Sequence, residues 1–205
     1  MPNSPRAPRR SLSALVTALA VVVAGCAGDL STGDLQGVMI EEPTPKPAFT
    51  LTDTEGEPYD FASETEGRVT LLYFGYLNCP DICPVHLAQI AEVFDREPEV
   101  ARETDVVFVS VDPDRDSPEA IREFLDNFDT DFIGLTGTRK ELDAAQSAAG
   151  VPKAVLVGEG EDYTVDHAGW VIAYAADGLN HSIYPFGVRQ SEWANDLQIL
   201  TEIQG

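Results

Sequence analysis

The chain has 205 residues, of which 35 are acidic and 13 are Lys or Arg, so its formal net charge is −22 at pH 7. This length allows one domain with a substantial core and a terminal segment. The negative charge argues against nucleic-acid binding and against electrostatic docking on an anionic membrane, because both surfaces repel acidic proteins. The composition suits an exported domain with a solvated acidic surface.

The first 25 residues have the features of a signal peptide. Three arginines precede an apolar stretch at residues 12–24, which is too short for a confident transmembrane helix. The stretch ends in Val-Ala-Gly before Cys26. This resembles a bacterial lipoprotein signal, in which Cys26 is lipidated and anchors the mature protein to the extracytoplasmic face of the cell membrane. An ordinary signal peptide or a short anchor helix remains the alternative.

Residues 26–47 are rich in Gly, Ser, Thr, Asp and Pro, and Pro recurs at 43, 45 and 47. Such a composition predicts a flexible tether. The folded domain is then expected over residues 48–205. It opens with an alternating stretch at 49–56 that ends in a turn, and residues 59–61 can return as the second arm of a hairpin.

One stretch organises the domain. Residues 69–74 form an unbroken apolar and aromatic run, which predicts a strand buried on both faces. Apolar residues at positions 87, 90, 91 and 94 then mark one face of a helix that ends near residue 97. Proline is tolerated only in a first helical turn, so Pro84 places Cys83 at the helix start and Cys79 in the preceding turn. A helix N-terminus favours thiolate over thiol.

The rest of the domain alternates strands with helices. Ser117 and Pro118 predict a helix start, as do Thr138 and Glu141, which form a capping box. Gly150 ends that second helix. Strands are expected at 106–111, 133–135, 154–157, 171–174 and 183–186, and a last helix over 193–200. This order predicts an α/β, thioredoxin-like fold with a central mixed sheet, flanking helices and an N-terminal hairpin.

The cysteine count narrows the chemistry. If Cys26 is lipidated, only Cys79 and Cys83 remain. In an oxidising, exported compartment this pair can cycle between dithiol and disulfide, or bind a metal. The C-x-x-x-C spacing is one residue longer than the redox C-x-x-C, and two thiolates at a helix start can converge on a soft ion, above all Cu(I). A purely structural disulfide is disfavoured, because a disulfide that closes so short a loop stabilises a fold only weakly.

A third ligand could come from His86, His167 or His181. His86 follows Cys83 by three residues and is expected to be a solvated helix residue. His181 falls in the closing hairpin. His167 precedes the strand at 171–174, in a loop that should lie beside the cysteine turn, and Asp166 could steady this loop or orient the histidine.

Three further carboxylates lie close together in sequence, at Asp112, Asp114 and Asp116. Their spacing suggests a loop that binds a divalent ion. Pro113 and the helix cap at Ser117 explain them better, so we expect no metal there.

Three motifs resemble the Sco (SenC) family of copper-assembly proteins: residues 73–84, 110–119 and 163–167. The resemblance covers residues 48–203. It implies a thioredoxin fold in which Cys79, Cys83 and His167 bind copper, as Cu(I), Cu(II) or both. It also implies a role in delivering copper to, or reducing the cysteines of, the binuclear copper centre of cytochrome c oxidase, with another cuproprotein as the alternative partner. One departure is Ala-Gly-Trp at 168–170, where members often have a hydroxyl residue and aliphatics, which could alter copper access.

Two other functions stay open. A thiol–disulfide oxidoreductase would use Cys79 and Cys83, but it would not need His167. A thiol peroxidase would need an arginine beside its reactive cysteine, and the sequence places none near the cysteine turn. The leading prediction is therefore a copper-binding assembly protein rather than an enzyme in the strict sense. A disulfide between Cys79 and Cys83 is expected in the oxidised, metal-free protein.

Overall fold

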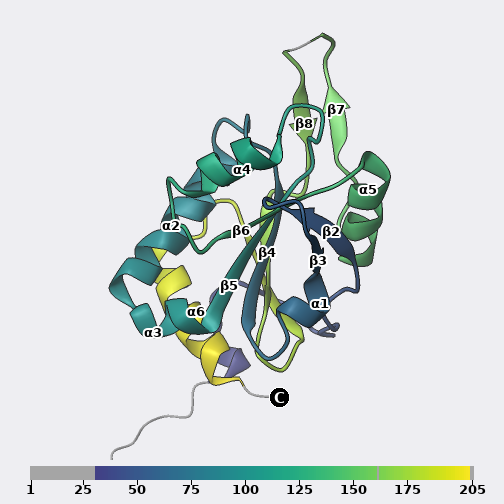
Figure 1. Ribbon diagram of the computed structural model, residues 1–205. Coiled ribbons are helices and arrows are strands. Elements are labelled where there is room, and N and C mark those ends of the chain that lie inside the picture. The colour runs from purple at the N-terminus through teal and green to yellow at the C-terminus, as the bar shows by residue number, and fades with distance from the viewer. Residues whose placement is uncertain (1–30, 161, 204–205) are drawn as a thin grey trace, which may run out of the picture.

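The computed structural model describes residues 31–160 and 162–203. Its centre is an eight-stranded mixed sheet of order β1-β10-β9-β4-β5-β6-β2-β3. The strands are β1 (Val38–Met39), β2 (Thr50–Asp53), β3 (Pro58–Asp60), β4 (Val69–Gly75), β5 (Thr104–Ser110), β6 (Ile133–Thr136), β9 (Trp170–Tyr174) and β10 (Asn180–Pro185). A separate antiparallel pair, β7 (Val155–Val157) and β8 (Thr164–Asp166), projects from one end of the molecule (Figure 1).

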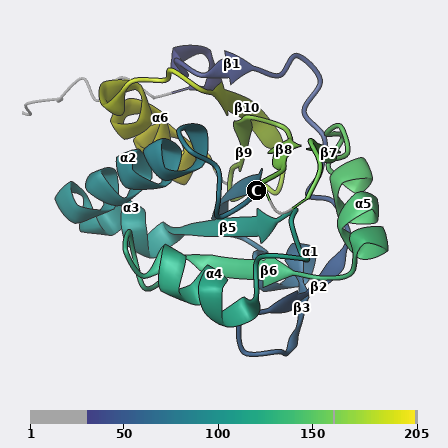
Figure 2. The ribbon, with the colours of Figure 1, turned by 90° about the horizontal axis from the view of Figure 1, so that it is seen from above.

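Helices cover both sides of the sheet. They are the 3-10 turn η1 (Thr32–Asp34) and the helices α1 (Phe61–Glu64), α2 (Ile82–Arg96), α3 (Pro98–Glu103), α4 (Pro118–Leu125), α5 (Arg139–Ala148) and α6 (Gln190–Glu202). In Figure 1, α2, α3, α4 and α6 lie on one side of the sheet, and α1 and α5 on the other. Figure 2 shows the same layers from above. The predicted α/β fold, with a central mixed sheet and flanking helices, is confirmed.

The central strand β4 has all seven side chains buried, as its continuous apolar sequence predicts. It pairs in parallel with β5 and antiparallel with β9. It ends at Gly75, where an added Cβ would lie 2.7 Å from Cε2 of Phe108 and 2.9 Å from Sγ of Cys83. Only glycine fits there, because a methyl group would overlap both atoms. The strand therefore passes close to Cys83 before the chain turns into α2.

The predicted helix starts are confirmed. The Ser117 side chain accepts a hydrogen bond from the Ala120 backbone N–H at 3.2 Å at the start of α4. At the start of α5, Thr138 and Glu141 form the reciprocal capping box. The hairpin of β2 and β3 is also present, although Phe61 begins α1 instead of ending the second strand.

The segment before residue 48 is not a free tether where the structure describes it. β1 pairs with β10, and Leu35 is buried. The Gln36 and Gly37 backbone N–H groups donate to Asp196 of α6 at 2.9 Å and 2.8 Å. The Lys46 amine donates to the Arg68 carbonyl at 2.9 Å. The tether prediction is therefore wrong for residues 31–47, because their backbone groups find partners on the domain.

The predicted signal peptide, Cys26 and residues 26–30 lie outside the described residues. Across residues 31–160 and 162–203, no helix combines the length and the apolar character that a membrane crossing requires.

Candidate metal centre

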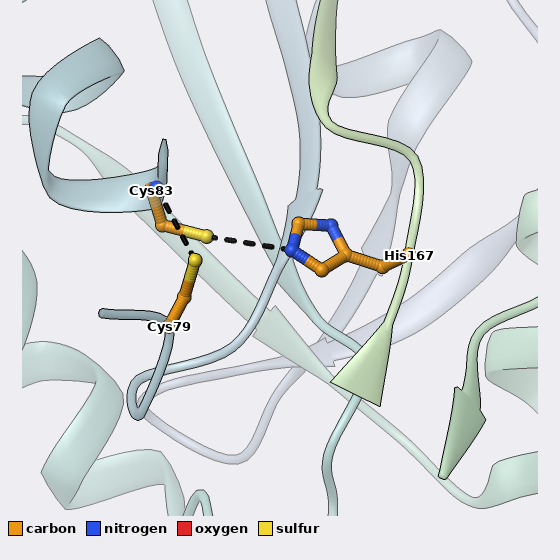
Figure 3. A group of neighbouring side chains, drawn as sticks. All are labelled: Cys79, Cys83 and His167. Carbon is orange, nitrogen blue, oxygen red and sulfur yellow. Dashed lines mark hydrogen bonds between the residues drawn. The ribbon is translucent and has the colours of Figure 1, made fainter. Parts of the chain in front are cut away.

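The two cysteines lie in the turn between β4 and α2. The Cys79 N–H donates to the Tyr76 carbonyl at 3.2 Å, which closes the turn, and Cys83 occupies the first turn of α2. Both cysteines are buried and form no disulfide with each other. The Cys83 backbone N–H donates to Sγ of Cys79 at 3.4 Å, so the N-terminus of α2 faces that sulfur (Figure 3). This is the environment that stabilises a thiolate.

His167 reaches the cysteines from the segment between β8 and β9. Its Nε2 lies 3.8 Å from Sγ of Cys83 (Figure 3). Its Nδ1 lies 3.1 Å from the Ala168 carbonyl, an acceptor, so Nδ1 carries the proton and donates. Nε2 is therefore left with a lone pair directed at the cysteines, as a metal ligand requires.

The three side chains form a group of suitable size for one metal ion. The ligand atoms of Cys79, Cys83 and His167 all lie within 4.8 Å of one another. Two sulfurs and one imidazole nitrogen are the donors that copper prefers. A shallow pocket of about 180 Å³ gives access to this group, and its lining is Tyr76, Cys79, Pro80, Asp81, Ile82, Val165, Asp166 and His167.

The two thiols differ strongly in acidity. The hydrogen bond from Cys83 lowers the pKa of Cys79 to about 4, and backbone N–H groups add to this effect. Burial raises the pKa of Cys83 well above its ordinary value. The metal-free site thus holds one thiolate at Cys79 and one thiol at Cys83, which share a proton between them.

Comparisons with known proteins agree with this geometry. The SCO1/SenC family model matches residues 38–202. The chain belongs to the SCO1/SenC family. It is 34% identical over 174 residues to a Stutzerimonas stutzeri protein named as copper-binding, and the match covers 83% of each chain.

Solved structures of the family match as well. The Bradyrhizobium japonicum ScoI structure with copper bound has 33% identity and a TM-score of 0.67, and the match covers 76% of this chain and 98% of that one. The yeast Sco1 structure with copper bound has 27% identity and a TM-score of 0.68, covering 76% and 87%. The predicted family and its thioredoxin-like fold are therefore confirmed.

The other two histidines of this SCO1/SenC protein lie elsewhere. His86 is 1% exposed and packs edge-on against Tyr73 and Trp193, with ring centres 5.4 Å and 6.0 Å away. The expectation of a solvated His86 is wrong, because this residue lies on the apolar face of α2. Burial lowers its pKa. His181 lies 2.7 Å from Oδ2 of Asp177, at the turn between β9 and β10.

The three carboxylates at positions 112, 114 and 116 are bound by other side chains of this protein. Asp112 pairs with Arg115, Asp114 with Arg139, and Asp116 accepts from Ser110. The carboxylates thus hold the loop between β5 and α4. Arg115 of this loop contacts Tyr163, in the segment that leads to His167.

Of the two residues beside His167, Asp166 lines the pocket and Ala168 does not. Asp166 is exposed, and its backbone pairs with Val155 of β7. Ala168 is buried, and Trp170 begins β9. The departure at residues 168–170 supplies no residue to the lining of the pocket, although a side chain at Gly169 would contact Ile82, which does line it.

The sequence did not single out Tyr73, whose hydroxyl donates to Sγ of Cys83 at 3.3 Å. A signal was present, because a tyrosine in a fully buried strand needs a partner for its O–H. Position 73 also shares a strand face with Gly75, which lies against the same sulfur. Tyr73 therefore belongs to the site as a donor to Cys83.

Proposed function

We propose that this chain is a copper-binding assembly protein and that Cys79, Cys83 and His167 hold the copper. The observation that carries this proposal is the convergence of two sulfurs and one imidazole nitrogen within 4.8 Å. The copper-bound relatives support it. Soft thiolates suit Cu(I), and the imidazole suits Cu(II) as well.

Cys79, Cys83 and His167 contribute differently to copper binding. Cys79 is already a thiolate near neutral pH, since its pKa is about 4. Cys83 must lose its proton when copper, the cargo, binds, so uptake should release a proton and weaken at low pH. As that proton leaves, Tyr73 can keep donating to the new thiolate at 3.3 Å. His167 offers Nε2 without losing a proton.

A copper titration of the reduced domain tests the proposal. One copper should bind per chain, and Cys79→Ser or Cys83→Ser should abolish tight binding, because a hydroxyl is a hard, poorly ionised donor. His167→Ala should retain Cu(I) on the two sulfurs but lose most Cu(II) and its thiolate charge-transfer colour. His181→Ala is the matched control and should leave both affinities unchanged.

Two results would overturn this assignment. If His86→Ala removed Cu(II) binding and His167→Ala did not, the third ligand would lie on α2. If none of the variants changed copper affinity, the copper function itself would be refuted.

We further propose that the partner is a copper-containing subunit of cytochrome c oxidase. The support is family membership, together with a metal group that opens to the surface through a pocket. Mixing the copper-loaded domain with the apo, soluble copper domain of that subunit should give transfer of copper. Alternatively, the reduced, metal-free domain should reduce a disulfide of the acceptor and itself be left with a Cys79–Cys83 disulfide. Absence of both reactions would refute this partner.

A thiol–disulfide oxidoreductase is the second candidate. The favouring observation is the Cys83 backbone N–H, which donates to Sγ of Cys79 and lowers its pKa, because a thiolate beside a thiol is the arrangement that performs disulfide exchange. The oxidised, metal-free protein should then contain a Cys79–Cys83 disulfide that a mild reductant opens. Two free thiols after air oxidation would exclude this cycle. Reductase activity that survives His167→Ala would favour it over copper delivery.

We also propose that the protein is lipid-anchored through Cys26 on the extracytoplasmic face of the membrane. The support is the Val-Ala-Gly-Cys sequence after a short apolar stretch. Cys26→Ala should release the protein from the membrane fraction or leave its precursor unprocessed. A processed, membrane-bound Cys26→Ala variant would contradict the anchor.

A further inference from the structure

The loop between β5 and α4, residues 111–117, contacts both the turn that carries the two cysteines and the segment that carries His167. We propose that this loop is a positioning element, which fixes His167 relative to the cysteines through Asp112, Arg115 and Tyr163. The inference rests on the proposed copper function. It gives a role to the conspicuous sequence at 110–119, which supplies no ligand.

On one side the loop holds the cysteine turn. The Val111 N–H donates to the Gly75 carbonyl at 2.8 Å, at the end of β4. Oδ2 of Asp116 accepts from the Leu77 backbone N–H at 3.0 Å. Leu77 precedes Cys79 by two residues. The start of the cysteine turn is therefore fixed to the loop at two points.

On the other side the loop holds the chain that carries His167. The Tyr163 hydroxyl donates to Oδ1 of Asp112 at 2.6 Å. Nη1 of Arg115 donates to the Tyr163 carbonyl at 2.9 Å, and its guanidinium lies 3.6 Å from the centre of the Tyr163 ring. Tyr163 directly precedes β8, and His167 directly follows it. Three contacts thus converge on one residue at the base of the histidine segment.

The two sides are joined inside the loop. Nε of Arg115 donates to Oδ2 of Asp112 at 2.6 Å, and the Asp112 side chain is fully buried. The Asp116 N–H donates to the Asp112 carbonyl at 3.0 Å. Hydrogen bonds to charged groups in a buried setting are strong and directional. A shift of Tyr163 would therefore have to break a charged network rather than one weak contact.

The histidine segment needs such support. β7 and β8 form a two-stranded sheet of three-residue strands, and all three residues of β7 are exposed. An isolated two-stranded hairpin is marginally stable in water. Without the contacts to Tyr163, the position of His167 would depend on the buried side chains of Val165 and Ala168 and on its connection to β9.

The decisive variant is Tyr163→Phe, which removes the hydroxyl and keeps the ring. Cu(II) affinity should fall about tenfold, since a hydrogen bond to a carboxylate is lost. Cu(I) affinity should change less, because the two sulfurs remain. Tyr184→Phe is a matched control, since the buried Tyr184 hydroxyl also donates to a carboxylate, that of Asp196 at 2.9 Å, on a helix that carries no metal ligand. It should lower thermal stability but leave Cu(II) affinity unchanged.

A double-mutant cycle separates positioning from general destabilisation. In a His167→Ala background, Tyr163→Phe should have no further effect on Cu(II) affinity, because the residue acts through His167. Arg115→Lys should behave like Tyr163→Phe, since lysine cannot donate to Asp112 and to the Tyr163 carbonyl from one planar group. In the metal-free protein, Tyr163→Phe should accelerate hydrogen exchange of the amides at residues 164–168.

Unchanged Cu(II) affinity in Tyr163→Phe, or an equal loss with and without His167, would overturn the positioning role. Failure of the wild-type protein to bind copper would instead refute the proposed function. The hydrogen-exchange rates at residues 164–168 would still test whether the loop holds the segment that carries His167.

Discussion

Sγ of Cys83 lies 3.8 Å from Nε2 of His167, although 84 positions separate the two residues in the chain. The topology explains this approach. β4 and β9 pair antiparallel, with Leu72 opposite Ile172, so the segment that leaves β4 lies beside the segment that enters β9. The metal centre therefore exists only in the folded domain, and copper binding should raise thermal stability by mass action.

Gly75→Ala should damage the fold and the metal centre together. The new methyl group would overlap Phe108 and the Cys83 sulfur, and overpacking of a core costs about 1–3 kcal/mol. Displacement of Cys83 should also weaken Cu(I) binding, which a competition titration measures.

The control for this variant is Gly134→Ala. Its methyl group would lie 2.5 Å from Cγ2 of Ile121, in the core away from the cysteines. It should lose a similar free energy of unfolding and keep its copper affinity. Equal copper affinities in Gly75→Ala and Gly134→Ala would refute the role assigned to Gly75.

Cys79 should react with iodoacetamide at a rate that barely changes between pH 6 and 8. Its pKa is about 4, chiefly because of the Cys83 hydrogen bond, so it is a thiolate throughout this range. An ordinary thiol, with a pKa of about 8.5, would react about tenfold faster for each pH unit. Mass spectrometry of the labelled peptide gives the rates. Cys83→Ser should restore part of the pH dependence, whereas a steep profile in the wild type would contradict the thiolate.

Lys46 should make stability rise with pH in a defined window. Burial lowers its pKa to about 8, from 10.5 in the unfolded chain. Between these values the unfolded state binds the proton more tightly, so the burial penalty disappears as pH increases. Because Lys46 is only half-buried, we expect a gain of about 1 kcal/mol relative to Lys46→Met between pH 8 and 10. Chemical denaturation of both proteins at several pH values measures this gain in the free energy of unfolding. If the two proteins changed in parallel with pH, the prediction would be contradicted.

Asp196 should stabilise the N-terminal segment. Its fully buried carboxylate accepts from the Gln36 and Gly37 N–H groups and from the Tyr184 hydroxyl. Asp196→Ala would leave these donors without an acceptor, at a cost of about 3 kcal/mol. Amides of β1 should also exchange faster. Asp126→Ala, which removes an exposed ion pair with Arg122, should cost less than about 0.5 kcal/mol, and equal costs in the two variants would refute the prediction.

The sequence predicts those elements whose signals are local. β4 is a continuous apolar run, and the caps at Ser117 and Thr138 are short patterns with a direct physical meaning. The sequence does not predict β1, α1, α3 and β8, because these elements are too short to show a periodicity. The burial of His86 was visible in principle, because positions 83, 86, 87 and 90 share one helix face.

The same distinction between local and long-range signals applies to the residues of the metal centre. The cysteine pair and its helix follow from spacing, whereas the choice of His167 depended on the family resemblance. The contact of Arg115 with Tyr163 spans 48 positions, and no local pattern announces it. Pairings of this kind arise from the packing of the whole sheet, so they appear only in the three-dimensional structure.

Because residues 31–47 are docked on the domain, they limit the distance that could separate the domain from a membrane. A free chain from Cys26 to residue 47 could extend about 70 Å, but only about 17 Å separates Cys26 from residue 31 at full extension. η1 lies at the opposite end of the molecule from the β7–β8 hairpin (Figure 1). A lipid on Cys26 would thus keep the η1 end against the bilayer and turn the cysteines outward. An acceptor would then have to present its copper site a full domain length above the lipid surface.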